Sequence, residues 1–348
     1  MDGNPDDDIR FERQGQAGII TLNRPKALNA VTHAMVLALA KQLPEWEADD
    51  AVKVVIIKGE GRAFSAGGDI LDVYRAGQAG KPQFQFFADE YRMNAALRAF
   101  KKPYVALIDG IVMGGGVGVS FHGSHRVLGE KALFAMPEVG IGFFPDVGGS
   151  YILSRIKGGY GMYLALTGAR IGPGDALHAG LATHTVRSED LAGIEAGIAE
   201  TGDPDGVLKG RTIAAPRSLD EAQAVAIGHH FTRGSLKDLI ESLQQAAEGG
   251  DEFATATLET LLKRSPTSLH VAFRQITYGA ALTMDECMKM EFRILNRMLT
   301  GKDFYEGIRA ALIEKGGTPK WQPATLAEID ESDIEAYFAP LPGGELDI

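Results

Sequence analysis

The 348-residue sequence predicts an α/β fold in its first half, followed by a mainly helical second half. In the first half, short runs rich in β-branched and other apolar residues alternate with stretches in which apolar residues recur at helical spacing. That rhythm is typical of sequential strand and helix units. After Gly148 the strand-like runs fade, while helical spacing with Ala, Leu and Met on one face continues. Because 45% of the residues are hydrophobic, the chain can bury a substantial core.

The expected elements of the first half follow one another as strand and helix. Short apolar runs with Val, Ile, Thr or Tyr favour strands, and longer stretches of helical period favour helices. The expected strands are 18–24, 52–59 and 102–110, and the expected helices are 32–46 and 86–100.

Five more helices are expected in the second half. They cover residues 219–228, 235–248, 252–263, 268–281 and 284–299. The preceding segment 201–218 is rich in Gly, Pro and Asp, which is typical of a linker. We therefore expect a catalytic core over 1–200, a linker over 201–218 and a helical region over 219–348.

Charge and cysteine content exclude several classes of protein. The chain has 35 Lys and Arg against 46 Asp and Glu, a net charge of −11, which disfavours a nucleic-acid partner. The single cysteine, Cys287, excludes an internal disulfide and a cysteine-clustered metal site, and we expect it in the core. No metal site is implied, because His122 and His125 lack a nearby acid or cysteine signature.

No targeting or membrane segment is recognised. The opening "MDGNPDDDIRF" is acidic and has neither the apolar stretch of a signal peptide nor the basic character of a transit sequence. No run approaches the roughly 18 apolar residues that a membrane-spanning helix needs. We expect a cytoplasmic protein without a membrane partner.

Two glycine-bearing turns follow expected strands, at 61–70 and 110–121. Glycine lets a ligand approach the backbone, and amides at a helix start point outward as an anion site. Two such turns are able to converge on one oxygen, although glycines also serve tight turns and close packing. The run "GGGVG" lacks the dinucleotide fingerprint, and no loop ends in the Gly-Lys-Ser/Thr of a P-loop, so a nicotinamide or ATP cofactor is not expected.

Two acids interrupt an apolar run at 132–150, "ALFAMPEVGIGFFPDVGGS". An ionised acid in apolar surroundings is costly unless it is paired, solvated or neutralised, so Glu138 and Asp146 need an explanation. One explanation is structural: Glu138 is then a helix-start acid and Asp146 the N-cap of a helix that begins near Gly148. The other is that both belong to an active site.

Four motifs in this order resemble the crotonase, or enoyl-CoA hydratase/isomerase, superfamily: "NRPKALNA" (23–30), "AFSAGGDI" (63–70), "VMGGGVGVS" (112–120) and "AMPEVGIGFFPDVGGS" (135–150). Within it, the chain is most similar to the 3-hydroxyisobutyryl-CoA hydrolase family. The marks of that family are the eight-residue spacing from Glu138 to Asp146 together with "ALTGARI" (165–171), "SPTSL" (265–269) and "DFYEGIRAALIEK" (303–315). The resemblance covers nearly the whole chain and implies a crotonase-like spiral of ββα units with a mainly helical C-terminal part.

The resemblance implies an oxyanion hole formed by the backbone N–H groups of Ala66 and Gly115, which grip a thioester carbonyl. It also separates two reactions. Hydratases of the superfamily use two glutamates, of which one falls at Gly118 here and the other at Glu138. Because one acid is missing, hydration is disfavoured. Asp146 stands where a hydratase has a small residue, so Glu138 and Asp146 are expected to catalyse hydrolysis of an acyl-CoA thioester.

Further binding residues follow from the same resemblance. Glu90 matches a residue that lines the substrate pocket, or it lies on a solvated helix face. Arg24, Lys26 and Arg62 either meet the phosphates of CoA or are surface charges. CoA is part of the substrate, so no separate cofactor is expected. Members of the superfamily commonly assemble as homo-oligomers, either trimers or hexamers, but a helical C-terminal half of this length is also able to fold back on its own core, so the oligomeric state stays open.

Hydrolysis of 3-hydroxyisobutyryl-CoA, a step of valine breakdown, is therefore the expected activity. Two alternatives stay open. One is an enoyl-CoA isomerase or hydratase that uses Glu138 to move a proton. The other is a non-catalytic protein that binds acyl-CoA.

Overall fold

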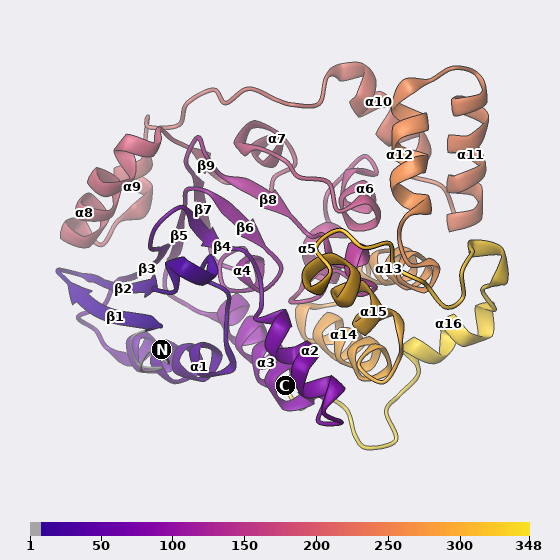
Figure 1. Ribbon diagram of the computed structural model, residues 1–348. Helices are drawn as coiled ribbons and strands as arrows, with labels where there is room; N and C mark the ends of the chain where they lie inside the picture. The colour runs from indigo at the N-terminus through magenta and orange to yellow at the C-terminus, as the bar shows by residue number, and fades with distance from the viewer. Residues whose placement is uncertain (1–7) are drawn as a thin grey trace. The chain divides into compact units, whose positions relative to one another are not determined.

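Nine β-strands in the described part of the chain form two sheets. The computed structural model describes residues 8–348, so the beginning of the acidic stretch searched for a targeting signal lies outside the described residues. The larger sheet has the strand order β1-β2-β3-β5-β7-β9, and the smaller sheet has the order β4-β6-β8 (Figure 1). The strands are β1 (Ile9–Gln14), β2 (Ala17–Leu22), β3 (Val54–Gly59), β4 (Ala63–Ser65), β5 (Tyr104–Ile108), β6 (Ile111–Met113), β7 (His125–Leu128), β8 (Leu133–Ala135) and β9 (His184–Thr185).

The order of the strands is that of a spiral. Each pass of the chain adds one strand to the larger sheet and then a short strand to the smaller one: β3 then β4, β5 then β6, β7 then β8. Every pairing is parallel except that of β1 with β2. Helices follow the first two passes. The expected spiral of ββα units is confirmed.

Helices make up most of the remaining described chain. The α-helices are α1 (His33–Ala48), α2 (Ile70–Gln78), α3 (Phe84–Ala99), α4 (Gly115–Gly118), α5 (Gly149–Leu153), α6 (Tyr160–Thr167), α7 (Pro173–His178), α8 (Leu191–Thr201), α9 (Pro204–Leu208), α10 (Glu221–His230), α11 (Leu236–Glu248), α12 (Glu252–Leu262), α13 (Pro266–Gly279), α14 (Met284–Met298), α15 (Asp303–Ile308) and α16 (Glu331–Phe338). Short 3₁₀ turns lie at η2 (Pro25–Ala27), η3 (Glu138–Ile141), η4 (Ser188–Asp190) and η6 (Leu326–Glu328), and a π-helical turn, η5 (Arg309–Ile313), follows α15.

All ten elements expected from the sequence are confirmed, and each boundary agrees within two residues. The helices of the second half begin where side chains cap them, because the first N–H groups of a helix have no partner within it. Capping boxes start α10 and α14, and a serine or aspartate side chain accepts a backbone N–H at the starts of α11, α12 and α13. The sequence analysis missed β1, β7 and β9 of the larger sheet and the short strands of the smaller sheet.

The chain divides into two compact units in a different way from the expected order of core, linker and helical region. Of the described residues, the first unit contains 8–69, 89–135 and 170–218, and the second contains 70–88, 136–169 and 219–348. Both units are therefore built from separate stretches of chain, and α3 crosses from one to the other. The reason is that residues 136–169 pack with the C-terminal helices, as α6 does with α13.

The segment 201–218, expected as a linker, belongs to the first unit. Its first part forms α9, which packs against α8. Further along, the N–H of Ile213 donates to the carbonyl of Thr185, and the Thr185 hydroxyl donates back to the Ile213 carbonyl. Gly, Pro and Asp content therefore identified an irregular segment here, but its backbone is bonded to β9.

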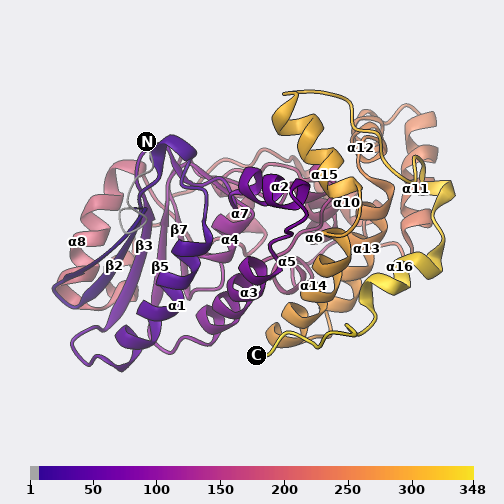
Figure 2. The same ribbon diagram turned by 60° about the horizontal axis from the view of Figure 1, so that its bottom comes forward.

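The core of the first unit lies between the larger sheet and α8. Side chains two residues apart on a strand share one face of a sheet, and such pairs from β2, β3 and β5 pack with Ile194 and Ile198 of α8. Figure 2 shows α8 lying along these strands. The strands β2 and β5 are buried throughout, as expected for parallel strands covered on both faces.

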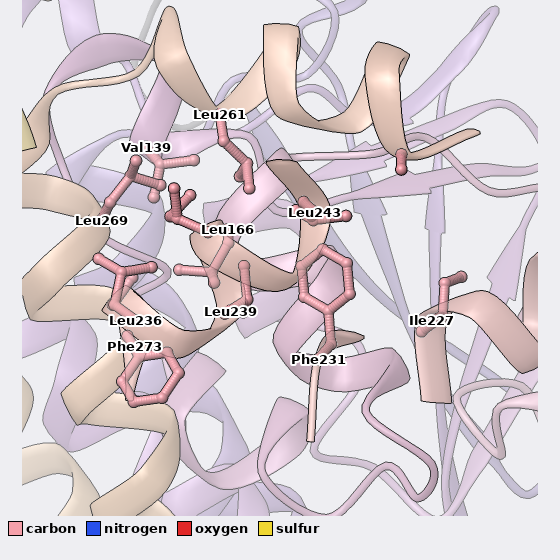
Figure 3. Close-up of a cluster of buried hydrophobic side chains, with 13 residues drawn as sticks. Val139, Leu166, Ile227, Phe231, Leu236, Leu239, Leu243, Leu261, Leu269 and Phe273 are labelled. Carbon is pink, nitrogen blue, oxygen red and sulfur yellow. The ribbon is translucent and has the colours of Figure 1, made fainter. Parts of the chain in front are cut away.

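The second unit has its own helical core. Val139 and Leu166 pack with apolar side chains from α10, α11, α12 and α13 (Figure 3). Cys287 is buried in α14, which confirms its expected place in a core. Among residues 8–348, none of the helices combines the length and the apolar character that crossing a bilayer requires.

Candidate active site

The first glycine loop, residues 66–68, follows β4 and is held in place by the motif around Asn29. The buried side chain of Asn29 donates to the carbonyl of Ala63 at 2.8 Å, and the Ser65 hydroxyl donates to the carbonyl of Asn29 at 2.8 Å. Beyond them, the Val31 N–H donates to the Gly67 carbonyl at 2.8 Å. The "NRPKALNA" motif thus shapes the loop through its backbone and its asparagine.

The second glycine loop starts α4 directly after β6. Gly114 adopts φ +45°, which L side chains rarely adopt. A Cβ on Gly116 would stand 2.6 Å from the carbonyl oxygen of Ser65, so the helix approaches the end of β4 more closely than any side chain permits. Close packing therefore explains Gly116, as the structural alternative supposed.

The two loops converge at Gly115. A Cβ placed on Gly115 would stand 3.1 Å from the Gly68 amide nitrogen and 3.1 Å from Oε1 of Glu90. Because Gly115 is the first residue of α4, its N–H has no acceptor within the helix. Ala66, the other predicted donor, gives its N–H to the carbonyl of Leu28 at 2.9 Å. For Ala66 and Gly115 to donate to the same substrate oxygen, the Ala66 N–H must either divide its hydrogen bond between that oxygen and the Leu28 carbonyl or give up the bond to Leu28.

Glu90 faces inward from α3. Its side chain is 2% exposed, so the solvated helix face considered for it is wrong. Its neighbour Asp89 takes the outward position and pairs with His33 at 2.9 Å and with Arg92 at 3.1 Å. One turn after Glu90, Asn94 is fully buried, and neither polar atom of its amide has a hydrogen-bond partner among the described residues. A buried amide of this kind requires water or a ligand. The sequence analysis missed Asn94.

Arg24 is occupied by structural bonds. Its guanidinium pairs with Asp8 and with Asp69, both at 3.1 Å, and donates to the carbonyl of Ala30 at 2.7 Å. These bonds tie the start of the "NRPKALNA" motif to the glycine loop. A phosphate would have to compete with two carboxylates for this side chain.

Lys26 and Arg62 are exposed, and neither forms an ion pair within the described part of the chain. They flank a close contact, because a Cβ on Gly61 would stand 3.1 Å from Cβ of Pro25. Two unpaired cations at one such contact suit a phosphate better than Arg24 does.

Glu138 is the first residue of η3, three positions after the end of β8, and it belongs to the second unit. Its position confirms a helix-start acid, but its side chain is only 7% exposed and Oε2 has no hydrogen-bond partner among the described residues. Burial raises its pKa well above 4.5, and the carboxylates of Asp146 and Glu291 raise it further. The adjoining Val139 anchors it in the helical core.

Asp146 is 5% exposed and is not the N-cap residue of α5. Gly148 is the N-cap residue, without a side-chain cap, and the backbone carbonyl of Asp146 accepts the N–H of Gly149 at 2.7 Å. The structural alternative for Asp146 is therefore wrong. Between them, Val147 has φ +49° and Gly148 has φ +86°, so the turn that carries Asp146 is an unusual one.

Two polar side chains that the sequence analysis missed hold this turn. Glu291 of α14 accepts the N–H groups of Gly148 and Ser150, both at 2.9 Å. The amide of Gln275 on α13 donates to the carbonyl of Pro145 at 2.5 Å and to the hydroxyl of Ser150 at 2.8 Å. No local pattern reveals either residue, because each lies more than 120 positions beyond its partners. A polar residue on the apolar face of an expected helix is the only available signal.

A family model covers most of the chain. The model described as enoyl-CoA hydratase/isomerase matches residues 17–338. The chain belongs to this family. Its curated relatives include the 3-hydroxyisobutyryl-CoA hydrolase, mitochondrial, of Danio rerio, 45% identical over 99% of this chain and 93% of the relative. The protein of the same name from Homo sapiens is 43% identical over 98% of this chain and 90% of the relative.

Solved structures of other family members also match. One is a carnitinyl-CoA dehydratase from Mycobacterium thermoresistibile, with a TM-score of 0.91 and 40% identity over 98% of each chain. Another is an enoyl-CoA hydratase from Rhodobacter sphaeroides 2.4.1, with a TM-score of 0.90 and 37% identity over 98% of this chain and all of the other. The names of these family members thus include both hydrolysis and water addition or removal, so the side chains must decide between these reactions.

Each unit of this enoyl-CoA hydratase/isomerase family member supplies one kind of chemistry. The first unit offers backbone amides at Gly115 and the 66–68 loop, which suit a developing oxyanion. The second unit offers buried carboxyls whose environment raises the pKa of Glu138, so that Glu138 holds a proton to a higher pH than an exposed glutamate does and is a stronger base once ionised.

Proposed function

We propose that the chain is an acyl-CoA thioester hydrolase that converts 3-hydroxyisobutyryl-CoA and water into 3-hydroxyisobutyrate and CoA. The observation that carries the proposal is the buried pair of Glu138 and Asp146, in which the second acid raises the pKa of the first. Relatives at 43% and 45% identity over nearly the whole chain bear the name of this activity.

Glu138 is the proposed catalytic group. Its carboxylate either takes a proton from water, whose oxygen attacks the thioester carbon, or attacks that carbon itself and forms a mixed anhydride that water then opens. In both routes the C–S bond breaks, the sulfur leaves as the CoA thiolate, and that thiolate then takes up a proton. Because burial raises the pKa of Glu138, the carboxylate is a stronger base than an exposed glutamate.

The Gly115 N–H is one proposed donor to the oxyanion, and an amide of the 66–68 loop is the other. Ala66 is the expected second donor and must exchange its bond to Leu28 for one to the substrate oxygen. A preorganised donor of this kind contributes roughly 3–4 kcal/mol to the transition state in a site without water.

We assign Asp146 to the 3-hydroxyl of the acyl chain or to the attacking water, and Glu90 to the substrate pocket. The unpartnered Asn94 amide, one turn after Glu90, supports a pocket with polar groups. For the phosphates of CoA we favour Lys26 and Arg62, since Arg24 is already paired with two carboxylates.

The test is release of free thiol from a panel of acyl-CoA esters: 3-hydroxyisobutyryl-CoA, 3-hydroxypropionyl-CoA, isobutyryl-CoA and crotonyl-CoA. Hydrolysis liberates CoA, whereas isomerisation, hydration and binding do not. We expect rapid release from the hydroxylated esters. Absence of thiol with both of them would contradict the proposal.

Hydration is the second candidate, because the solved structures that match include a dehydratase and a hydratase. Against it stands Gly118 at the end of α4, which leaves Glu138 without the second glutamate of a hydratase. Loss of the enoyl absorbance of crotonyl-CoA without thiol release would favour hydration, and a shifted double bond in the product would favour an isomerase.

Compartment and assembly complete the proposal. The relatives' names place those proteins in mitochondria, and a cytoplasmic location for this chain stays a prediction, tested by fractionation. A trimer or hexamer is tested by sedimentation. That the reaction needs no metal or separate cofactor is tested by thiol release in the presence of a chelator.

A further inference from the structure

Glu291 is a completely buried carboxyl that the proposed chemistry leaves without a role. It lies on α14, and its two oxygens accept the N–H groups of Gly148 and Ser150. A buried carboxylate is costly unless hydrogen bonds satisfy it, so it is retained for what those bonds achieve. Both amides belong to the 145–150 turn, which carries Asp146.

The 145–150 turn needs external support. Val147, directly after Asp146, has φ +49°, and a β-branched side chain disfavours this left-handed conformation. Strained residues of this kind persist only where their surroundings fix them. If the support were removed, Val147 would relax toward an ordinary conformation and the Asp146 carboxylate would move with it.

The support comes from two helices. Glu291 on α14 holds the turn at Gly148 and Ser150, after Asp146, and Gln275 on α13 holds it at Pro145, before Asp146. Both helices pack against α5, the short helix that follows the turn, and both views place the three helices together (Figures 1 and 2). The backbone on either side of the acid is thus fixed from α13 and α14.

The charged groups that act on Glu291 do not include a basic partner for its carboxylate. The titratable groups that act on its surroundings are the carboxyls of Asp146 and Glu138 and the thiol of Cys287. The one basic side chain in this set, Arg155, bonds Cys287. No ion pair of Glu291 occurs among residues 8–348. Burial and Asp146 raise the pKa of Glu291 to about 8, although the hydrogen bonds from the Ser150 hydroxyl and from the backbone N–H groups of Gly148 and Ser150 lower it.

The two backbone N–H groups explain why residue 291 carries a carboxyl group. Two neighbouring N–H donors require two acceptors, which a carboxyl group supplies and a carboxamide does not, because one of its ends is a donor. An apolar side chain supplies none. The residue at this position therefore decides how firmly the 145–150 turn is held.

We propose that Glu291 is a positioning residue for the thioester hydrolysis: it fixes the 145–150 turn and thereby places the carboxylate of Asp146 beside Glu138. The inference rests on the proposed function. Misplacement of a working group by about 1 Å lowers turnover by roughly 100-fold, so loosening the turn affects kcat before it affects binding of the CoA part.

The experiment compares Glu291→Gln and Gln275→Leu in the full chain, with 3-hydroxyisobutyryl-CoA as the substrate and thiol release as the signal. The carboxamide keeps the shape of Glu291 but satisfies only one of the two N–H groups. Gln275→Leu loosens the same turn from α13 without changing a charge. We expect both variants to lose roughly 10- to 100-fold in kcat per folded molecule, with KM changed by less than about 3-fold.

Asp175→Asn is the matched control. Asp175 is also buried and accepts a backbone N–H, that of Ser218 at 2.8 Å, but it lies on α7 in the first unit and has no bond to the turn. Its variant is expected to melt at a lower temperature and to keep its kcat per folded molecule.

The outcomes separate the inference from the proposed function. If Glu291→Gln lowers only the melting temperature, as the control does, the residue is merely structural and the inference is wrong. If Glu291→Gln lowers kcat but Gln275→Leu does not, some property of the Glu291 carboxyl other than its support of the turn is responsible, and the positioning role is again wrong. If the unmodified protein releases no thiol, the proposed function fails and the inference fails with it.

Discussion

Glu138→Gln separates a catalytic acid from a structural one, because the two roles predict opposite changes in stability. The substitution keeps the shape of the side chain and removes its charge. As a general base or nucleophile, Glu138 contributes roughly 10²- to 10⁴-fold, so we expect kcat to fall by that factor. A helix-start acid that served only the fold would leave kcat unchanged and would lower stability when replaced.

The stability change follows from the raised pKa of Glu138. The folded protein holds the proton of this buried carboxyl at pH values where the unfolded chain, with a pKa near 4.5, has released it. The contribution of Glu138 to the free energy of unfolding therefore falls as the pH rises from 4.5 to the folded-state pKa, by about 1.4 kcal/mol per pH unit, and is constant above it. A glutamine at position 138 does not titrate, so the variant does not lose this stability as the pH rises. The variant gains stability relative to the unmodified protein as the pH rises through that window.

The assay combines thiol release with urea unfolding at pH 4.5, 6 and 8. The control is Glu306, a carboxyl whose pKa is lowered instead of raised: its hydrogen bonds with Arg309 lower the pKa to about 2. The stability that Glu306 contributes is present above pH 4.5 and is lost as the pH falls, so Glu306→Gln is destabilised at pH 8 and keeps its kcat. If Glu138→Gln turns over normally, or if its stability relative to the unmodified protein falls between pH 4.5 and pH 8, the reasoning about Glu138 is refuted.

Three further substitutions test the remaining roles. Asp146→Asn should lower the preference for 3-hydroxyisobutyryl-CoA over isobutyryl-CoA, measured as the ratio of their kcat/KM values, and an unchanged ratio would contradict contact with the hydroxyl. Gly115→Pro removes the N–H at a first helical position, where proline is tolerated, and should abolish thiol release. Its control, Gly115→Ala, adds a similar Cβ but keeps the N–H and should keep measurable turnover. Equal activities of the two variants would exclude this amide as a donor. Gly118→Glu restores the missing hydratase acid and should give at most a trace of crotonyl-CoA hydration, so robust hydration by the unmodified protein would contradict our interpretation of Gly118.

Much of the fold could be predicted because its signals are local. Strands buried on both faces leave continuous apolar runs, as in β2 and β5, and helices that cover a core on one side leave a 3.6-residue period. The three-residue strands of the smaller sheet have no such signal, since three residues do not establish a period. They form because β3, β5 and β7 are already paired and deliver the following residues side by side.

The candidate site shows the same division. The sequence by itself determined that Glu138 and Asp146 interrupt an apolar run and that two glycine loops follow strands. Both signals are visible in single residues, because burying a carboxylate is costly wherever it occurs and glycine is conformationally free wherever it occurs. Only the tertiary structure decided which way Glu90 faces, that the Ala66 N–H is engaged by Leu28, and that Glu291 holds the turn of Asp146. Bonds such as the last join residues 143 positions apart. A hydrogen bond depends on distance in space, and the chain pattern around either partner carries no record of the other.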